Sequence, residues 1–390
     1  MNSPRNHPSL PPAPSERPMR QGSPRRRVVR TETGQLQTGA LMIIAFAVVL
    51  FLLVQARFLL VTLATAIVLF SLTSDAINFI ARQRIGPFRI PNWLASITAL
   101  MAISLALLVL TSVILSQVNT VLTTALAYTE RAPEAIASLF AWLGADAEQA
   151  VYNSIASIRV SAWLSTLAGQ AGGLMQATVL VILFVGFLFA ERIWFRTKMD
   201  AFFGSEAQAA RVGQVISTII HRVNYYLLVK TFISAITGLL VFVIAKLFGL
   251  DLAVALGIVT FVLNYIPNIG SIIATVMVAL VAFVQLGGPG MTAAIFLLIG
   301  VIQFVAGSVI DPMLMGRALR LSSFGIIISL AFWGAVWGIP GMFLSVPIMV
   351  GLMIVCSQVP SLRPIAILLS REGLPDPEAQ ALGEDSIAAE

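Results

Sequence analysis

Asp311 ends a long apolar run and is the acidic side chain best suited to chemistry inside a membrane. An ionisable group in such a run is costly, and it usually marks a substrate pathway or a proton relay. Gln303 precedes Asp311 by two helical turns and could share its face. Pro312, Gly316 and Arg317 follow it. The alternative is that Asp311 only forms a structural ion pair with Arg317.

A second group of candidates surrounds a break in the apolar sequence at Pro267. Residues 252–265 would form a helix of about 21 Å, which is shorter than the roughly 30 Å hydrocarbon core. Pro267 removes a backbone donor and disfavours helix before it, and the carbonyl groups freed at membrane depth need protein or water around them. Asn264 and Asn268, four residues apart, are predicted to line the same place, with Gly270 just beyond.

The sequence breaks a second time, at Gly338, Pro340 and Gly341. Each break has an Ile-Pro pair and a nearby glycine between two apolar arms. The charges indicate that the first broken segment is entered from outside, after Asp251, and the second from the cytoplasm, after Arg320. Discontinuous helices in two oppositely oriented units are the best sequence pointer to a transporter's binding site. Kinked helices without a site are the alternative, because Pro and Gly are common in membrane helices.

These candidates belong to a chain that is 58% apolar and only 11% charged. Soluble domains are nearer 45–50% apolar and about a quarter charged. The apolar runs are continuous, as in membrane helices, and do not alternate as barrel strands do. With one cysteine, two histidines and no metal, nucleophile or phosphate-loop motif, no catalytic residue, metal site or cofactor is expected. We therefore expect an all-α polytopic integral membrane protein and not an enzyme.

The predicted organisation has about eight transmembrane helices, with two broken helical hairpins in the C-terminal half. Its segments are a disordered basic cytoplasmic tail (1–36), three transmembrane helices (37–115), an extramembrane insert of amphipathic helices (116–172), a transmembrane transport core (173–358) that contains a cytoplasmic loop (191–230), and an acidic cytoplasmic tail (359–390). The broken segments 252–286 and 322–358 are compatible with re-entrant and with fully spanning paths.

The distribution of charge predicts the orientation in the membrane. Arg and Lys are concentrated in the N-terminal tail, around residues 82–89 and in the loop 191–230, whereas the charges of 116–172 nearly cancel. The positive-inside rule therefore assigns both termini to the cytoplasm and the insert to the far side. The same rule accounts for the net charge of +6 without nucleic acid as a partner.

Three stretches carry a resemblance to a known family: FVLNYIPNIGS (261–271), IQFVAGSVIDPMLMGRALRLS (302–322) and LAFWGAVWGIPGMFLSVPI (330–348). They resemble the autoinducer-2 exporter family, also called PerM-type permeases, and the match in motif covers about 225–370. Where many members have Gly-Asn, this chain has Gly307-Ser308, and where many have Ser-Pro, it has Ser322-Ser323.

The resemblance implies a homo-oligomeric secondary transporter of the bacterial inner membrane. The expected cargo is a small polar solute, such as an autoinducer-2-like signalling molecule, and the expected coupling ion is a proton or sodium. One alternative is a monovalent cation/proton antiporter in which Asp311 is the proton-linked carboxylate. An alternative of another class is a membrane scaffold or assembly protein that docks its partners on 116–172.

Overall fold

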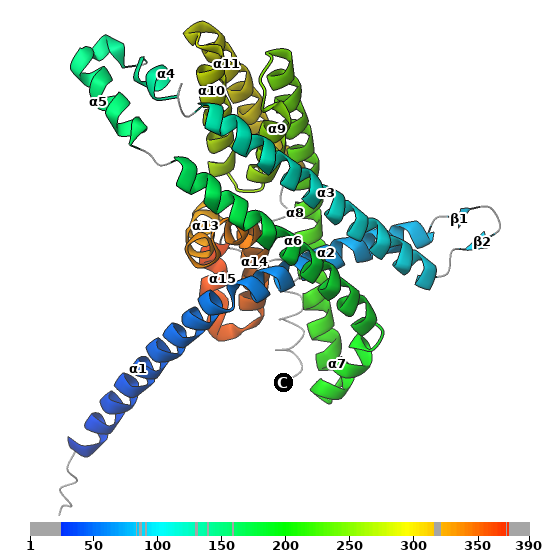
Figure 1. Cartoon of the computed structure of the whole chain (residues 1–390). Coiled ribbons are helices and arrows are strands. Elements are labelled where there is room, and N and C mark those ends of the chain that lie inside the picture. The colour runs from blue at the N-terminus through cyan, green and yellow to red at the C-terminus, as the bar shows by residue number, and fades with distance from the viewer. Residues whose placement is uncertain are drawn as a thin grey trace, which may run out of the picture. The chain divides into compact units, whose positions relative to one another are not determined.

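The computed structural model describes residues 25–82, 84–85, 88–89, 92–128, 132–138, 140–157, 160–315, 321–371 and 373 (Figure 1). Eight helices in these ranges are long and apolar enough to cross a membrane. Their spans are Gln37–Gln55, Arg57–Ser74, Ser96–Thr124, Gly172–Glu191, Glu206–Leu247, Ile269–Leu286, Pro289–Met315 and Ile339–Gln358. The prediction of an all-α polytopic membrane protein is confirmed. One short hairpin, β1 (Arg84–Ile85) with β2 (Phe88–Arg89), lies in the predicted basic loop.

Helix α1 (Arg25–Gln55) falls almost wholly in the first of two compact units, Met1–Leu53. None of the residues of its apolar span is buried, and Leu41, Ile43 and Phe51 are among its exposed side chains. A continuous apolar surface of this length needs lipid or protein around it.

In the second unit, α2 (Arg57–Arg82), α3 (Asn92–Tyr128) and α6 (Val160–Glu191) pack against one another. Their core contains Ala66 and Val185, and the hydroxyl oxygens of Thr111 and Thr178 lie 2.9 Å apart between α3 and α6. Small residues at the contacts let the helix backbones approach closely, and shared hydroxyl groups hold the helices together without water.

Both ends of the predicted insert continue the membrane helices. Helix α3 runs well past residue 116, and α6 begins well before residue 172. Between them lie α4 (Ala132–Ser138), η1 (Ala141–Leu143) and α5 (Ala145–Ala156). Val151 and Ile155 of α5 are half-buried while most of its other side chains are exposed, as in an amphipathic helix. The location of this segment outside the membrane stays a prediction.

Helix α8 (Glu206–Leu247) follows the short helix α7 (Phe195–Phe203) and is the longest helix in the described ranges. Its 42 residues span about 63 Å, twice the hydrocarbon core. Much of the predicted loop 191–230 is therefore helical. The hydropathy of the sequence predicted only the second half of α8, because polar and charged residues are mixed with apolar ones in its first four turns. Whether those turns lie in the cytoplasm stays a prediction.

The first broken hairpin consists of α9 (Ala253–Leu263) and α10 (Ile269–Leu286), and α11 (Pro289–Val305) packs on it. Figure 1 shows these helices grouped beside α8. A methyl group added at Gly238 of α8 would lie 2.8 Å from the carbonyl oxygen of Gly257. The backbones of α8 and α9 are therefore in direct contact, as small residues allow in membranes.

The second broken hairpin consists of α13 (Ser323–Trp337) and α14 (Ile339–Gln358), followed by η3 (Pro360–Leu362) and α15 (Arg363–Leu369). Val346 and Val350 of α14 pack in one core with Val223 and Leu227 of α8. Between the hairpins, α11 continues into a π-helical segment, η2 (Ala306–Ile310), and then into α12 (Asp311–Met315). Both hairpins therefore pack on α8.

The predicted orientation can be tested with single cysteines in a Cys356→Ser background, since Cys356 is the native thiol. Ser138 and Gln208 are both exposed. We expect Ser138→Cys to react with an impermeant maleimide added outside intact cells, and Gln208→Cys to react only after permeabilisation. The reverse labelling pattern would contradict the orientation.

Candidate functional site

Both hairpins turn at a residue with a left-handed backbone. Asn268, between α9 and α10, has φ 60° and is the non-glycine residue with positive φ in the described ranges; Gly338, between α13 and α14, has φ 68°. A glycine follows shortly after each turn. A methyl group at Gly270 would lie 1.7 Å from the carbonyl oxygen of Leu263, and one at Gly341 would lie 2.0 Å from that of Trp333. Only glycine fits where the two arms of each hairpin cross.

The two hairpins meet at Tyr265, beside the first turn. Its ring lies 4.5 Å from that of Phe343, which belongs to α14 and follows the second turn. The Tyr265 hydroxyl also lies 2.6 Å from Oγ1 of Thr231, on α8. Tyr265 therefore joins both breaks to the middle of α8.

One residue from Thr231, the ammonium group of Lys230 contacts Oδ2 of Asp311 at 2.5 Å. The Lys230 side chain is only 5% exposed and that of Asp311 17%. The hydroxyl of buried Tyr226, one turn earlier on α8, interacts electrostatically with Asp311 and with Tyr265. Neither this hydroxyl nor Oδ1 of Asp311 has a hydrogen-bond partner in the part of the chain that the structure describes. The ion pair therefore lies close to the meeting point of the hairpins. The Tyr226 hydroxyl and Oδ1 of Asp311 could each make a further hydrogen bond there.

Asp311 was predicted from the sequence, whereas Lys230 was not, because it fell in the predicted loop 191–230. A signal was present: Lys230 is the one charged residue between Arg222 and Lys246, so it interrupts an apolar run as Asp311 does. The π-helical turns of η2 directly precede Asp311 and change the face to which it points. The proposed partner Arg317, together with Gly316, lies outside the described residues, so that pairing stays a prediction. Pro312 is exposed in the first turn of α12.

The two asparagines at the first break face different surroundings. Asn264 is buried, and its Nδ2 donates to Oγ1 of Thr237 on α8 at 2.7 Å. Asn268 is exposed and lines a separate groove of about 370 Å³ between α10 and the α11–η2 region. Gln303 lines the same groove and is 5% exposed. Asn264 thus holds the hairpin to α8, while Asn268 and Gln303 lie at the groove.

At the second break, Pro340 is exposed in the first turn of α14 and Gly341 is buried. Pro267 is half-buried at the first break. The backbone N–H of Gly338 donates to the carbonyl of Gly334 at 2.9 Å, which closes the end of α13. Pro267 and Gly338 thus lie in the two hairpin turns, while Pro340 and Gly341 lie at the start of the helix that follows the second turn.

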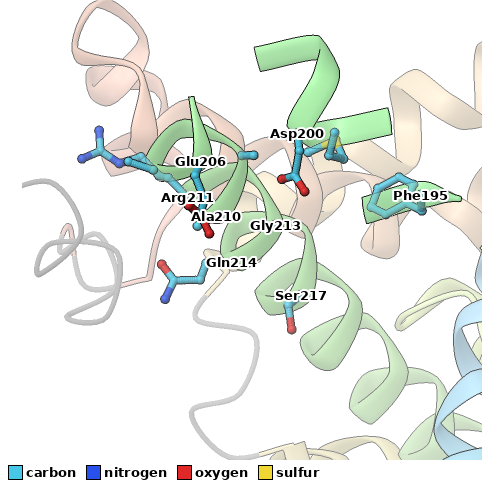
Figure 2. Close-up of a pocket in the computed structure, with 11 residues that line it drawn as sticks. Phe195, Asp200, Glu206, Ala210, Arg211, Gly213, Gln214 and Ser217 are labelled. Atoms are coloured by element: carbon cyan, nitrogen blue, oxygen red, sulfur yellow. The ribbon is translucent and has the colours of Figure 1, made fainter. Parts of the chain in front are cut away.

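A larger cavity, of about 1010 Å³, lies at the start of α8. Figure 2 shows Asp200 and Phe195 of α7 beside it, with Glu206, Arg211, Gln214 and Ser217 of α8. None of the residues predicted as a pathway lines it. In the described ranges, His, Cys, Asp and Glu side chains form no cluster that could bind a metal.

The arrangement of hairpins, ion pair and motif residues can be compared with known proteins. The family model described as AI-2E family transporter matches residues 40–360. The chain belongs to this family. The resemblance carried by the three motifs is confirmed, and the match begins well before residue 225, so that it also includes α2, α3 and α6.

Two curated relatives are similar to about half of this chain. AI-2 transport protein TqsA of Escherichia coli is 34% identical over 210 residues, which is 53% of this chain and 59% of TqsA. A Borreliella burgdorferi protein named "Putative transport protein" is 31% identical over 199 residues, which is 50% of this chain and 54% of that protein. The chain thus spans little more than half the length of the curated relatives it matches.

Proposed function

We propose that this protein carries a small polar solute across the bacterial inner membrane, through the region where the two broken hairpins meet. The observation that supports this most is the buried Lys230–Asp311 pair beside that meeting point. A buried pair adds little stability compared with apolar residues of the same size, and charges inside membrane proteins usually serve a pathway. The two hairpins that meet beside the pair are discontinuous, as transporter helices are at binding sites.

An autoinducer-2-like signalling molecule is the finer proposal for the solute, and it rests on the name of the relative TqsA. Coupling to a proton or a sodium ion is proposed from the carboxylate of Asp311. We propose that both termini lie in the cytoplasm and that the functional form is a homo-oligomer.

Monovalent cation/proton exchange is the second candidate, and the same ion pair favours it. A cation bound to the Asp311 carboxylate competes with the Lys230 ammonium for the same oxygen. In this alternative Asp311 is the proton-linked carboxylate, which a cation and a proton would occupy in turn.

The two candidates are separated by flux in proteoliposomes that contain the purified full-length protein. Neutral polyols and aldoses, the corresponding aldonates, and sodium and potassium ions are loaded, and their efflux is measured with and without proton and sodium gradients. We expect efflux of an organic solute that a proton or sodium gradient accelerates. Movement of cations and protons alone would favour exchange, and no movement of any kind would contradict transport.

A further inference from the structure

The groove between α10 and the α11–η2 region offers hydrogen bonds but no charge. Its polar lining consists of Asn268, Ser271, Thr275, Gln303 and Ser308. No Asp, Glu, Lys, Arg or His is among its lining residues. Its volume of about 370 Å³ lies in the range of small-molecule sites, near the lower end.

Gln303 is the most informative residue of this groove. It follows Ile295 and Ile299 at four-residue intervals on the buried face of α11, where an apolar side chain would pack equally well. Neither its amide nitrogen nor its amide oxygen has a hydrogen-bond partner in the ranges that the structure describes. A primary amide has two N–H donors and a carbonyl acceptor, so the Gln303 side chain could make several further hydrogen bonds. Leaving it unused at 5% exposure is unfavourable, which points to a ligand that uses it.

The other lining residues define what such a ligand looks like. Ser271 donates its hydroxyl to the carbonyl of Asn268 at 3.0 Å, and Thr275 donates to that of Ser271 at 2.8 Å, so both hydroxyl oxygens remain free to accept. Gly300 and Gly307 also line the groove, and because they have no side chain the space beside them stays open. Apolar side chains on both sides, such as Ile272 and Phe304, suit a carbon skeleton.

We propose that this groove binds an uncharged solute rich in hydroxyl or carbonyl groups, with Gln303 as its principal hydrogen-bonding residue. The absence of charge in the lining selects against anions and cations, which would lose water without gaining a counter-charge. A lipid chain or an apolar helix over the groove would leave the amide unsatisfied. This inference rests on the proposed transport function and names the class of its solute.

The first test measures efflux from proteoliposomes loaded with C4–C6 alditols and aldoses together with the corresponding aldonates. For Gln303→Leu we expect at least about a tenfold loss of neutral-solute efflux at subsaturating concentration, because one or two hydrogen bonds are removed. The variant should melt no lower than the wild type, since it removes an unsatisfied buried group. Thr292→Val is the matched control on α11, outside the groove, and should transport normally.

The second test measures binding alone, with single cysteines in the Cys356→Ser protein. Ser308 lines the groove and is exposed, whereas its neighbour Val309 is exposed but outside the lining. We expect the neutral solutes to slow modification of Ser308→Cys by a hydrophilic thiosulfonate at least threefold, with no effect at Val309→Cys. Protection by the aldonates alone, or by neither class, would overturn the proposal.

The two proposals fail in different ways. Wild-type efflux restricted to aldonates or inorganic ions would overturn the neutral-solute site and leave transport intact. Efflux of neutral solutes that is unchanged in Gln303→Leu would also overturn the site. A wild-type protein that moves nothing, while neutral solutes still protect Ser308→Cys, would contradict transport and support the site.

Discussion

Replacing Lys230 with methionine, or Asp311 with asparagine, is expected to lower the free energy of unfolding by about 3–5 kcal/mol, because either change leaves one buried charge without its partner. Replacing both residues together should restore most of that stability, since no charge is then stranded. The coupling energy from this double-mutant cycle separates the pair from the individual side chains. Unfolding in detergent by titration with dodecyl sulfate gives the required free energies.

The Lys198–Glu191 pair provides a matched control, because its side chains are 64% and 54% exposed. Lys198→Met should change the stability by less than about 1 kcal/mol, as expected of surface ion pairs. If both single variants at the buried pair were as stable as the wild type, Lys230 and Asp311 would not form a desolvated pair. If the double variant stayed as unstable as the single ones, the loss would come from packing instead.

Gly270→Ala and Gly341→Ala are expected to destabilise the protein by at least about 3 kcal/mol each. The added methyl groups would lie 1.7 Å and 2.0 Å from the carbonyl oxygens of Leu263 and Trp333, so the arms of each hairpin would have to separate. These oxygens belong to the backbone and cannot rotate away as a flexible side chain could. We therefore expect a lower melting temperature and a loss of transport in both variants.

Gly186→Ala is the control for these substitutions, since a methyl group at that position in α6 meets nothing within 4 Å. Alanine is a better helix former than glycine, so this variant should be neutral or slightly more stable. Normal stability in Gly270→Ala or Gly341→Ala would show that the arms do not cross as closely as the structure indicates.

The parts of the candidate site that follow from local backbone chemistry were predicted from the sequence. Proline disfavours helix before it. Pro267 lies between α9 and α10, and Pro340 lies in the first turn of α14, so both breaks lie where the sequence predicts them. Asp311 stood out because a single charge in an apolar run is rare. The eight membrane helices follow from hydropathy in the same way.

The parts that depend on tertiary packing were not predicted. Lys230 and Asp311 are 81 residues apart, and only the packing of α8 against the α11–α12 region brings them together. Asn264 and Asn268 were expected in one place because they are one helical turn apart, but the helix ends between them and Asn268 has a left-handed backbone. The length of α8 was not predicted because its first turns mix polar with apolar residues, so they do not form the continuous apolar run by which a membrane helix is recognised.

The central claim is that the Lys230–Asp311 pair serves transport and not only stability. Efflux from proteoliposomes with equal densities of wild-type protein or the Lys230→Met/Asp311→Asn double variant tests it most directly, because the double variant is expected to remain folded. We predict gradient-dependent efflux of neutral solutes by the wild type and background efflux by the double variant. If the double variant transported at the wild-type rate, with its gradient dependence intact, the ion pair would have no role in transport.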